Sequence, residues 1–502
     1  MTKLISRRLL LGGMSSLVAF GAQAEAPLTS PRPAPRTPLQ AATAVRAAIA
    51  DADQLMEAAQ LGGKVGFAVA NARTGQVLEA HNPLLKMPPA SVAKAVTAVY
   101  GLETLGGGYR FRTQLIATGP VVGGEIKGDL VLAGGGDPVM DTDDLADLAA
   151  RLKAAGVTAV SGKFKVYAGA LPYHRVIDRS QPDHLGYNPA VSGLNLNFNR
   201  VYFQWKRGAS GYDVTMDARS EKYRPQVAIA RMRVVDREAP VYTYRQDGNI
   251  DNWTVARGAL GKEGSRWLPV RRPDLYAAEV FQSFARAQGI RLKTAVPVRS
   301  MPGGTVVAAL DSAELKTITR LMLKYSTNLT AEVIGLTAST ARGRSPKSLE
   351  ASARAMNSWM KQTLGTKHAK LVDHSGLNDR SRLSASDMIK VLVRTGSTGQ
   401  LHGLMKEVVP LDAAGDRNPN AGYSIQAKTG SLNFVSSLAG YIQPNTGSPL
   451  VFTIFTGDLK RRAGISRDDR ERPEGARGWA RRSRRLQHQL ISRWAAKYGS
   501  AP

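Results

Sequence analysis

The sequence predicts an α+β fold in which an antiparallel sheet flanked by helices is interrupted by a large strand-rich insertion. The first observation is a change of pattern: residues 102–270 hold short strand segments separated by Gly and Asp, with helical periodicity mainly at 145–155. The second is that helical periodicity returns after this region and gives way to a short β meander and a final helix. We expect helices at residues 274–288, 314–323, 330–341, 346–364, 385–394 and 476–498, and strands at 425–428, 436–442 and 450–456.

The domain boundaries follow from these changes of pattern. Residues 41–101 and 271–502 are expected to form the two parts of the main domain, which ends in a basic helix. Residues 102–270 are expected to form one or two nested domains. Residues 25–40 are rich in proline, so we expect an extended linker there.

Residues 1–24 have the pattern of an export signal. Basic side chains, including the pair Arg7-Arg8, precede an apolar run that is too short to span a membrane. Ala22-Gln23-Ala24 then offers small residues for cleavage near Ala24. The sequence therefore predicts an exported protein, and the paired arginines leave the twin-arginine and general routes both open.

Composition narrows the chemistry. The chain of 502 residues has no cysteine, which excludes disulfides, thiol catalysis and thiolate metal sites. No motif indicates a metal or a cofactor. The formal net charge is +28, and residues 460–485 are strongly basic. In an exported protein this charge is consistent with a solvated strip or with contact to an anionic wall or membrane surface, and nucleic acid is not indicated.

Three short motifs in a fixed order carry the chemistry. They are Ser91-Val92-Ala93-Lys94, Ser326-Thr327-Asn328 and Lys428-Thr429-Gly430, the S-x-x-K, S-x-N and K-T-G pattern of serine enzymes that recognise penicillin. Two further matches are Ser358-Trp359-Met360-Lys361 and Ser431-Leu432-Asn433. Neither has the correct order along the chain, so only the first set is expected to form a site.

The residue types explain the expected chemistry. A serine hydroxyl needs a base, and Lys94 shares one helix face with Ser91 because the two are three residues apart. Lysine acts as a base when burial and nearby positive charge, here from Lys428, lower its pKa. Ser326 can pass the proton to the leaving amine, and Asn328 can hold Lys94 and the substrate amide.

The K-T-G strand supplies the expected substrate contacts. Lys428 and Thr429 can anchor a substrate carboxylate, and Gly430 allows the substrate to approach the backbone closely. The backbone N–H groups of Ser91 and Ser431 are expected to form the oxyanion hole.

With these motifs the sequence resembles peptidase family S13, the D-alanyl-D-alanine carboxypeptidase/endopeptidase group of penicillin-binding proteins. The resemblance runs from about residue 42 to 498. It also rests on the segments Gly106-Gly107-Gly108-Tyr109-Arg110-Phe111, Gly128-Asp129-Leu130-Val131-Leu132, Gly134-Gly135-Gly136-Asp137-Pro138 and Asp373-His374-Ser375-Gly376-Leu377. The resemblance implies a transpeptidase/β-lactamase-like domain, a periplasmic location, action on peptidoglycan stem peptides and cross-bridges, and covalent capture by β-lactams.

The resemblance also implies residues that recognise the diaminopimelate end of a substrate. The matching positions are Asp183, Tyr187, Arg380 and Asn433. His374 replaces the usual glycine of D-G-S-G-L, and we expect a structural role for it.

Other classes fit less well. A Ser-His-Asp hydrolase would need a G-x-S-x-G elbow and a zinc peptidase H-E-x-x-H, and neither occurs. A β-lactamase-like hydrolase shares the three motifs but not the long insertion. A non-catalytic wall-binding protein would be expected to lose Ser91, Lys94 or Lys428, all of which are present.

Overall fold

The computed structural model describes residues 50–396, 399–412 and 414–499. The predicted export signal, the linker and the start of the first catalytic segment lie outside this part of the chain. The residues described below belong to the compact unit Ile49–Pro502.

A six-stranded antiparallel sheet forms the centre of the main domain, in the order β17-β18-β19-β20-β1-β2. The predicted meander is present as β18, β19 and β20, and β1 from the N-terminal part pairs with the far edge of β20. Strands from before and after the insertion therefore share one sheet, as a split domain requires. The strands are Lys64–Asn71 (β1), Val77–His81 (β2), Lys406–Glu407 (β17), Tyr423–Leu432 (β18), Val435–Pro444 (β19) and Leu450–Gly457 (β20).

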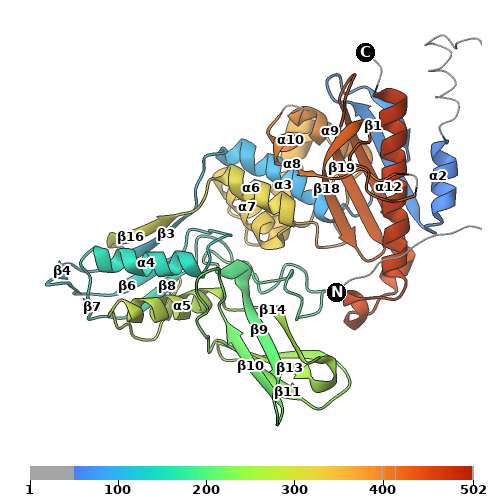
Figure 1. The fold of residues 1–502 in the computed structure, drawn as a ribbon. Coiled ribbons are helices and arrows are strands. Elements are labelled where there is room, and N and C mark those ends of the chain that lie inside the picture. The colour runs from blue at the N-terminus through green and yellow to red at the C-terminus, as the bar shows by residue number, and fades with distance from the viewer. Residues whose placement is uncertain (1–49, 397–398, 413, 500–502) are drawn as a thin grey trace, which may run out of the picture. The chain divides into compact units, whose positions relative to one another are not determined.

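Helices cover both faces of this sheet (Figure 1). On one face α12 packs against β19 and α2, with Trp479 and Trp494 fully buried in the core that it shares with the strands. On the other face α9 contacts β20 and β1, and a layer of helices encloses a second core. The helices are Ala52–Ala59 (α2), Ala93–Leu105 (α3), Leu315–Tyr325 (α6), Asn328–Ala341 (α7), Leu349–Leu364 (α8), Ala385–Thr395 (α9), Gln400–Leu404 (α10), Leu459–Ala463 (α11) and Ala476–Tyr498 (α12).

The insertion contains two groups of strands around a shared third core. A mixed sheet in the order β15-β8-β6-β3-β16 is accompanied by α4 and α5, and two three-stranded sheets, β10-β9-β14 and β11-β13-β12, follow in the middle of the insertion. The elements are Arg112–Ala117 (β3), Val121–Val122 (β4), Glu125–Ile126 (β5), Leu130–Ala133 (β6), Thr142–Ala154 (α4), Ala159–Val160 (β7), Phe164–Tyr167 (β8), Arg200–Arg207 (β9), Tyr212–Asp217 (β10), Ala230–Val235 (β11), Tyr242–Asp247 (β12), Ile250–Ala256 (β13), Glu263–Pro269 (β14), Pro273–Ala287 (α5), Val296–Val298 (β15) and Thr305–Asp311 (β16).

The insertion ends later than residue 270, where the sequence analysis placed its boundary. The helix expected after that point is present as α5, but it packs against α4. β16 then pairs with β3, and the chain returns to the main domain only at α6. Helical periodicity identified α5 correctly but cannot show which of two cores an apolar face covers, and this caused the error.

Candidate active site

Ser91 lies on a tight turn that opens helix α3. A single 3₁₀ turn, Ala90–Val92, leads directly into the helix, so the expected helix start near Ala90 is confirmed. Ala90 has a φ of 46°, which alanine rarely adopts. A β-carbon on Gly376 would lie 1.8 Å from the Ala90 carbonyl oxygen, so the segment around Gly376 packs tightly beneath the turn and supports its strained backbone.

Lys94 is fully buried one helical turn after Ser91. Its Nζ lies 2.9 Å from Ser91 Oγ, 2.6 Å from Asn328 Oδ1 and 2.8 Å from the Ser375 carbonyl oxygen. Burial, followed by the charge of Lys428, holds the pKa of Lys94 well below its usual range. In the neutral amine the two carbonyl oxygens accept both hydrogens, so the nitrogen lone pair is left facing the serine hydroxyl.

Lys428 brings the third motif to the same place. Its Nζ donates hydrogen bonds to Ser326 Oγ at 3.1 Å and to the Thr429 carbonyl oxygen at 2.7 Å. Burial, followed by the charge of Lys406, lowers the pKa of Lys428 to about 8. Ser326 has a φ of 59° directly after α6, and it lines the same pocket as Ser91. The structure therefore brings Ser91, Lys94, Ser326, Asn328 and Lys428 together.

Strand β18 passes unusually close to the nucleophile turn. A β-carbon on Gly430 would lie 2.7 Å from the Pro89 carbonyl oxygen and 2.9 Å from the Ser91 nitrogen. Only glycine allows this approach, which keeps the Ser91 N–H beside the strand that carries Ser431. Ser431 lines the pocket in front of Ser91, whereas Thr429 is exposed on the same strand outside the lining.

A buried acidic pair stands behind the site and was not identified from the sequence. The Glu332 carboxylate accepts hydrogen bonds from the backbone N–H groups of His374 and Ser375. It thereby fixes the Ser375 carbonyl that holds Lys94. Burial, followed by the charge of Asp373, raises the pKa of Glu332 to about 8, and burial also raises that of Asp373.

His374 has the structural placement that we expected. It is fully buried beneath Gly335 of α7, and its Nε2 lies 2.8 Å from Ser352 Oγ. Burial lowers its pKa to about 3, so it is neutral at physiological pH. It does not line the pocket.

A pocket of about 1010 Å³ opens in front of Ser91. One wall comes from the first two motifs and from the residues that directly follow the third, one from the insertion, and one from the segment between β20 and the start of α12. That last segment contributes most of the positive charge and was not assigned to the site from the sequence. The lining residues with charged or amide side chains are Gln181, Arg266, Asn328, Asn433, Arg462, Arg470, Glu471, Arg472 and Arg477.

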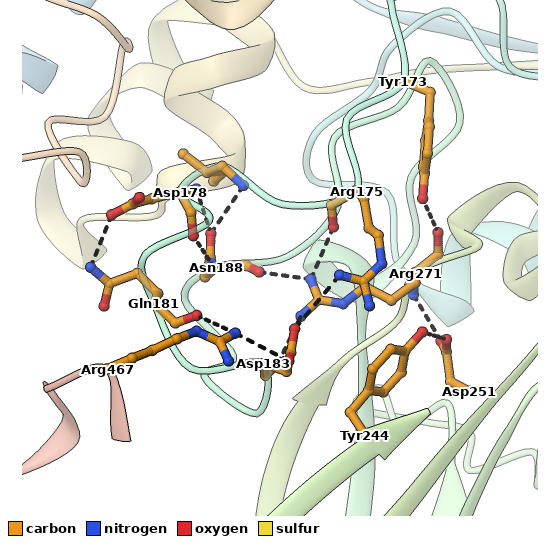
Figure 2. A network of polar contacts seen from close by, with 11 residues as sticks. Tyr173, Arg175, Asp178, Gln181, Asp183, Asn188, Tyr244, Asp251, Arg271 and Arg467 are labelled. Carbon is orange, nitrogen blue, oxygen red and sulfur yellow. Dashed lines mark hydrogen bonds and ion pairs between the residues drawn. The ribbon is translucent and has the colours of Figure 1, made fainter. Parts of the chain in front are cut away.

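The insertion reaches the catalytic residues through the loop that contains Tyr187. The Tyr187 carbonyl oxygen accepts a hydrogen bond of 2.8 Å from Asn328 Nδ2, which turns Asn328 Oδ1 toward Lys94. Figure 2 shows what holds this loop: the fully buried Arg271 donates to the carbonyl oxygens of Asp183 at 2.7 Å and Asn188 at 3.0 Å. Tyr187 also lines the pocket, so this predicted residue lies at the site.

Two predicted recognition residues are placed elsewhere. The carboxylate of Asp183 faces Arg467 at 3.1 Å and Arg175 at 3.6 Å, outside the pocket lining (Figure 2). Arg380 has a side chain that is 64% exposed, pairs with Glu350 at 3.5 Å, and does not reach the pocket. In both cases a match in sequence position did not specify the direction of the side chain.

Asn433 and a neighbouring arginine lie at the pocket instead. Arg462, with a side chain only 5% exposed, donates to Asp379 at 2.9 Å and to the Asn433 carbonyl oxygen at 3.0 Å. Asn433 Nδ2 in turn donates to the Arg470 carbonyl oxygen at 2.5 Å. Arg462 therefore supplies a guanidinium at the pocket, whereas the family resemblance had indicated Arg380 as the recognition arginine.

Neither a metal centre nor a membrane span is present in the described part of the chain. No group of three or more His, Cys, Asp or Glu side chains there is placed to bind a metal ion. No helix in the same residues combines the length and apolar character needed to cross a bilayer.

The transpeptidase/β-lactamase-like fold and the Ser91–Lys94 pair, in which the lysine is buried, define a serine hydrolase. Residues 46–472 match the D-Ala-D-Ala carboxypeptidase 3 (S13) family, and the chain belongs to that family. It is 26% identical to the D-alanyl-D-alanine carboxypeptidase of Actinomadura sp. (strain R39), over 85% of this chain and 86% of that protein. It is also 26% identical to the D-alanyl-D-alanine carboxypeptidase DacB of Haemophilus influenzae, over 80% and 87% of the two chains.

A solved structure agrees with this fold. The crystal structure of penicillin binding protein 4 (dacB) from Haemophilus influenzae superposes with a TM-score of 0.68, at 22% identity, over 88% of this chain and 99% of that one. The same protein complexed with a β-lactam superposes with a TM-score of 0.67, at the same identity and coverage.

Proposed function

We propose that this enzyme hydrolyses D-Ala-D-Ala and cross-bridge bonds in peptidoglycan stem peptides through an acyl-enzyme on Ser91, and that β-lactams acylate the same serine. The observation that carries the proposal is the environment of Lys94. A buried amine with two carbonyl acceptors and its lone pair toward Ser91 Oγ is arranged as a general base.

The acylation step follows from this arrangement. Lys94 accepts the Ser91 proton as Oγ bonds to the scissile carbonyl carbon, and the oxyanion that forms is held by the N–H groups of Ser91 and Ser431. Ser326, which accepts a hydrogen bond from Lys428, gives its proton to the leaving nitrogen as the C–N bond breaks and takes in its place the proton that Lys94 received. Lys428, beside Ser326, is proposed to anchor the substrate carboxylate together with Thr429, which is exposed on the same strand outside the pocket lining. Water then hydrolyses the ester, which releases the acid and regenerates Ser91.

The pocket supports a substrate larger than a terminal dipeptide. Its volume of about 1010 Å³ exceeds what one D-alanine needs, and Arg462, Arg470 and Arg477 give it a positive wall. We propose that this wall binds carboxylates of a second stem peptide, with Tyr187 and Asn433 at the same side. This favours endopeptidase activity in addition to carboxypeptidase activity.

Covalent labelling with a fluorescent penicillin tests the nucleophile. We expect stoichiometric labelling of the wild type and none of Ser91→Ala. Ser358→Ala is the matched control, because Ser358 begins the second S-x-x-K match but donates to the Arg354 carbonyl oxygen on an exposed face of α8. Labelling of Ser91→Ala, or no labelling of the wild type, would contradict the proposal and favour a non-catalytic wall-binding protein.

Product analysis separates the possible activities. Purified cross-linked muropeptides are incubated with the enzyme and the products identified by mass. Release of free D-alanine identifies carboxypeptidase activity, and conversion of dimers to monomers identifies endopeptidase activity. Rapid turnover of penicillin without cleavage of either substrate would favour a β-lactamase-like hydrolase instead.

We also propose export to the periplasm, with cleavage near Ala24. The pattern of residues 1–24 supports this, and the family acts on a polymer found outside the cytoplasm. Sequencing the N-terminus of the protein from a periplasmic extract tests it. A mature chain that still begins at Met1 would contradict the proposal.

The basic segment 460–485 is proposed to bind an anionic wall or membrane surface. Arg481 and Arg484 are exposed on the face of α12 that points away from the sheet. We expect sedimentation with isolated cell wall that weakens as salt rises, because exposed charges are screened within about 10 Å at 0.1 M salt. Arg481→Ala with Arg484→Ala should weaken it, whereas Arg231→Ala with Arg233→Ala should not; retention independent of salt would count against the proposal.

A further inference from the structure

One wall of the catalytic pocket is a short segment of the main domain, residues 466–473, which we call the strap. It lies between α11 and α12 and contains one 3₁₀ turn, Asp468–Glu471. Another wall belongs to the insertion, so the contacts between the strap and the insertion set the shape of the pocket. The strap residues in the pocket lining are Arg470, Glu471, Arg472 and Pro473.

The carboxylate of Glu471 lies between two side chains of the insertion. Its Oε2 is 2.8 Å from Nε2 of His184, and its Oε1 accepts a hydrogen bond of 3.0 Å from Arg266. The hydrogen bond with His184 and the charge of Arg266 lower the pKa of Glu471 to about 2, against the effect of burial, so the carboxylate is ionised at physiological pH. The exposed fractions of Glu471, His184 and Arg266 are only 31%, 14% and 24%, so solvent screens these contacts less than those of a surface pair.

A single aromatic ring orients both insertion partners of this carboxylate. The imidazole of His184 stacks on Tyr242 of β12 with the ring centres 5.1 Å apart, and the guanidinium carbon of Arg266 lies 4.9 Å from the centre of the same ring. Ordinary surface ion pairs contribute little, in part because two flexible side chains must be held in one geometry. Since Tyr242 already holds both partners, we expect the Glu471 contact to be stronger than an ordinary surface pair.

Two arginines of the strap add further contacts with the insertion. Arg467 donates to the Gln181 carbonyl oxygen at 3.0 Å and to the Asp183 carboxylate at 3.1 Å (Figure 2). Arg470 donates to Ser180 Oγ at 2.6 Å. Each of these contacts is made by a side chain of the strap, and no backbone–backbone hydrogen bond joins the strap to the insertion in the described part of the chain. Replacement of a few side chains should therefore loosen the strap and leave both domains folded.

We propose that Glu471 is a positioning residue for cross-linked substrates: its contacts with the insertion hold the strap where the guanidinium of Arg470 binds a carboxylate of the second stem peptide. This inference rests on the proposed function, in which the arginine wall binds that peptide. The guanidinium of Arg470 donates one hydrogen bond among the described residues, to Ser180, so further N–H groups remain for a substrate. A carboxylate in this positive wall would by itself repel an anionic substrate, so its contacts with the insertion account for the presence of Glu471.

The test compares variants by their KM and kcat for a purified cross-linked muropeptide dimer. His184→Phe keeps an aromatic ring on Tyr242 but removes the bond to Glu471, and His184 lies outside the pocket lining, so it makes no contact of its own with substrate there. We expect KM to rise about tenfold while kcat changes less than twofold, because binding is weakened and the chemical step is not. Asp468→Ala is the matched control and should have the wild-type KM, because the Asp468 side chain is exposed on the same turn and has no hydrogen-bond or ion-pair partner among the described residues.

Glu471→Ala is the second variant, and the sign of its effect separates two roles of this carboxylate. It should raise the KM for the dimer as His184→Phe does, whereas loss of a merely repulsive charge would lower it. Backbone hydrogen exchange of the strap should become faster in both variants, and labelling by fluorescent penicillin shows that each is folded. An unchanged or lower KM in either folded variant, or unchanged exchange of the strap, would overturn the proposal. If the wild type cleaved no dimers, the proposed function would fail and this proposal with it; dimer cleavage with the wild-type KM in both variants would remove this proposal alone.

Discussion

Replacement of Gly430 by alanine tests how closely strand β18 approaches the nucleophile. The added carbon would lie 2.7 Å from the Pro89 carbonyl oxygen, 2.9 Å from the Ser91 nitrogen and 3.0 Å from the Val92 nitrogen. All three are backbone atoms of the strained nucleophile turn, so they cannot move aside as a flexible side chain would. The strand and the turn must therefore separate, and overpacking of this kind destabilises a fold by about 1–3 kcal/mol.

The separation should affect catalysis more than folding. It moves the Ser91 and Ser431 N–H groups apart, and loss of one oxyanion-hole donor slows a reaction by about 10²–10³-fold. We therefore expect the rate of acylation by fluorescent penicillin to fall by about 10²–10³-fold in Gly430→Ala, because the oxyanion forms in this step.

Gly258→Ala is the matched control, because nothing lies within 4 Å of the carbon it adds. Its acylation rate and melting temperature should equal those of the wild type. If Gly430→Ala were acylated within threefold of the wild-type rate while remaining folded, the N–H of Ser91 would not form the oxyanion hole with this strand.

Three further outcomes are expected. The acylation rate should first rise with pH, because Lys94 loses its proton at a pH below the usual range of lysine, and then fall as the pH passes about 8, where Lys428 loses its charge. Lys428→Arg should shift the alkaline limb of this profile to higher pH. A rate that stays flat through pH 9 would contradict the assignment. Arg271→Lys should slow acylation by about tenfold, because its three carbonyl contacts hold the loop that orients the Asn328 amide, and an unchanged rate in stopped-flow labelling would show that this loop does not act on the site. Arg462→Ala should reduce cleavage of cross-linked muropeptides by about tenfold, whereas Arg380→Ala should change it less than twofold; the reverse order in a product assay by mass would restore Arg380 as the recognition residue.

The sequence predicted those features that depend on local pattern. Six predicted helices are present with ends within three residues of the expected ones, and α12 spans 476–498 as expected, because Trp479, Leu486, Leu490 and Trp494 recur on one face between arginines. The three motifs could be assigned to one site because the residues within them are spaced as on a helix turn, at a helix junction and on a strand.

Features that depend on which surfaces meet were not predictable in this way. The end of the insertion was wrongly placed at residue 270 because the amphipathic pattern of α5 fits a helix of either domain. The Ser375 carbonyl that holds Lys94 is a backbone atom, and its position depends on Glu332. This is the one charged residue of helix α7, whose sequence otherwise resembles an ordinary core segment. In the sequence, nothing distinguishes Arg462 from the other basic residues of its segment. The structure shows that it is buried beside Asn433.

The insertion takes part in setting the protonation chemistry of the site. Asn328 has one amide with two ends: Oδ1 accepts from Lys94, and Nδ2 donates to the Tyr187 carbonyl oxygen. If the amide were reversed, Nδ2 would face the lysine and compete for its lone pair, so the base would be lost. The Tyr187 carbonyl prevents this reversal, and it is a backbone atom of a loop that the buried Arg271 fixes on both sides, at Asp183 and Asn188. The nucleophile and its base thus come from the main domain, while the insertion keeps the amide between them in the orientation that leaves Lys94 able to accept a proton.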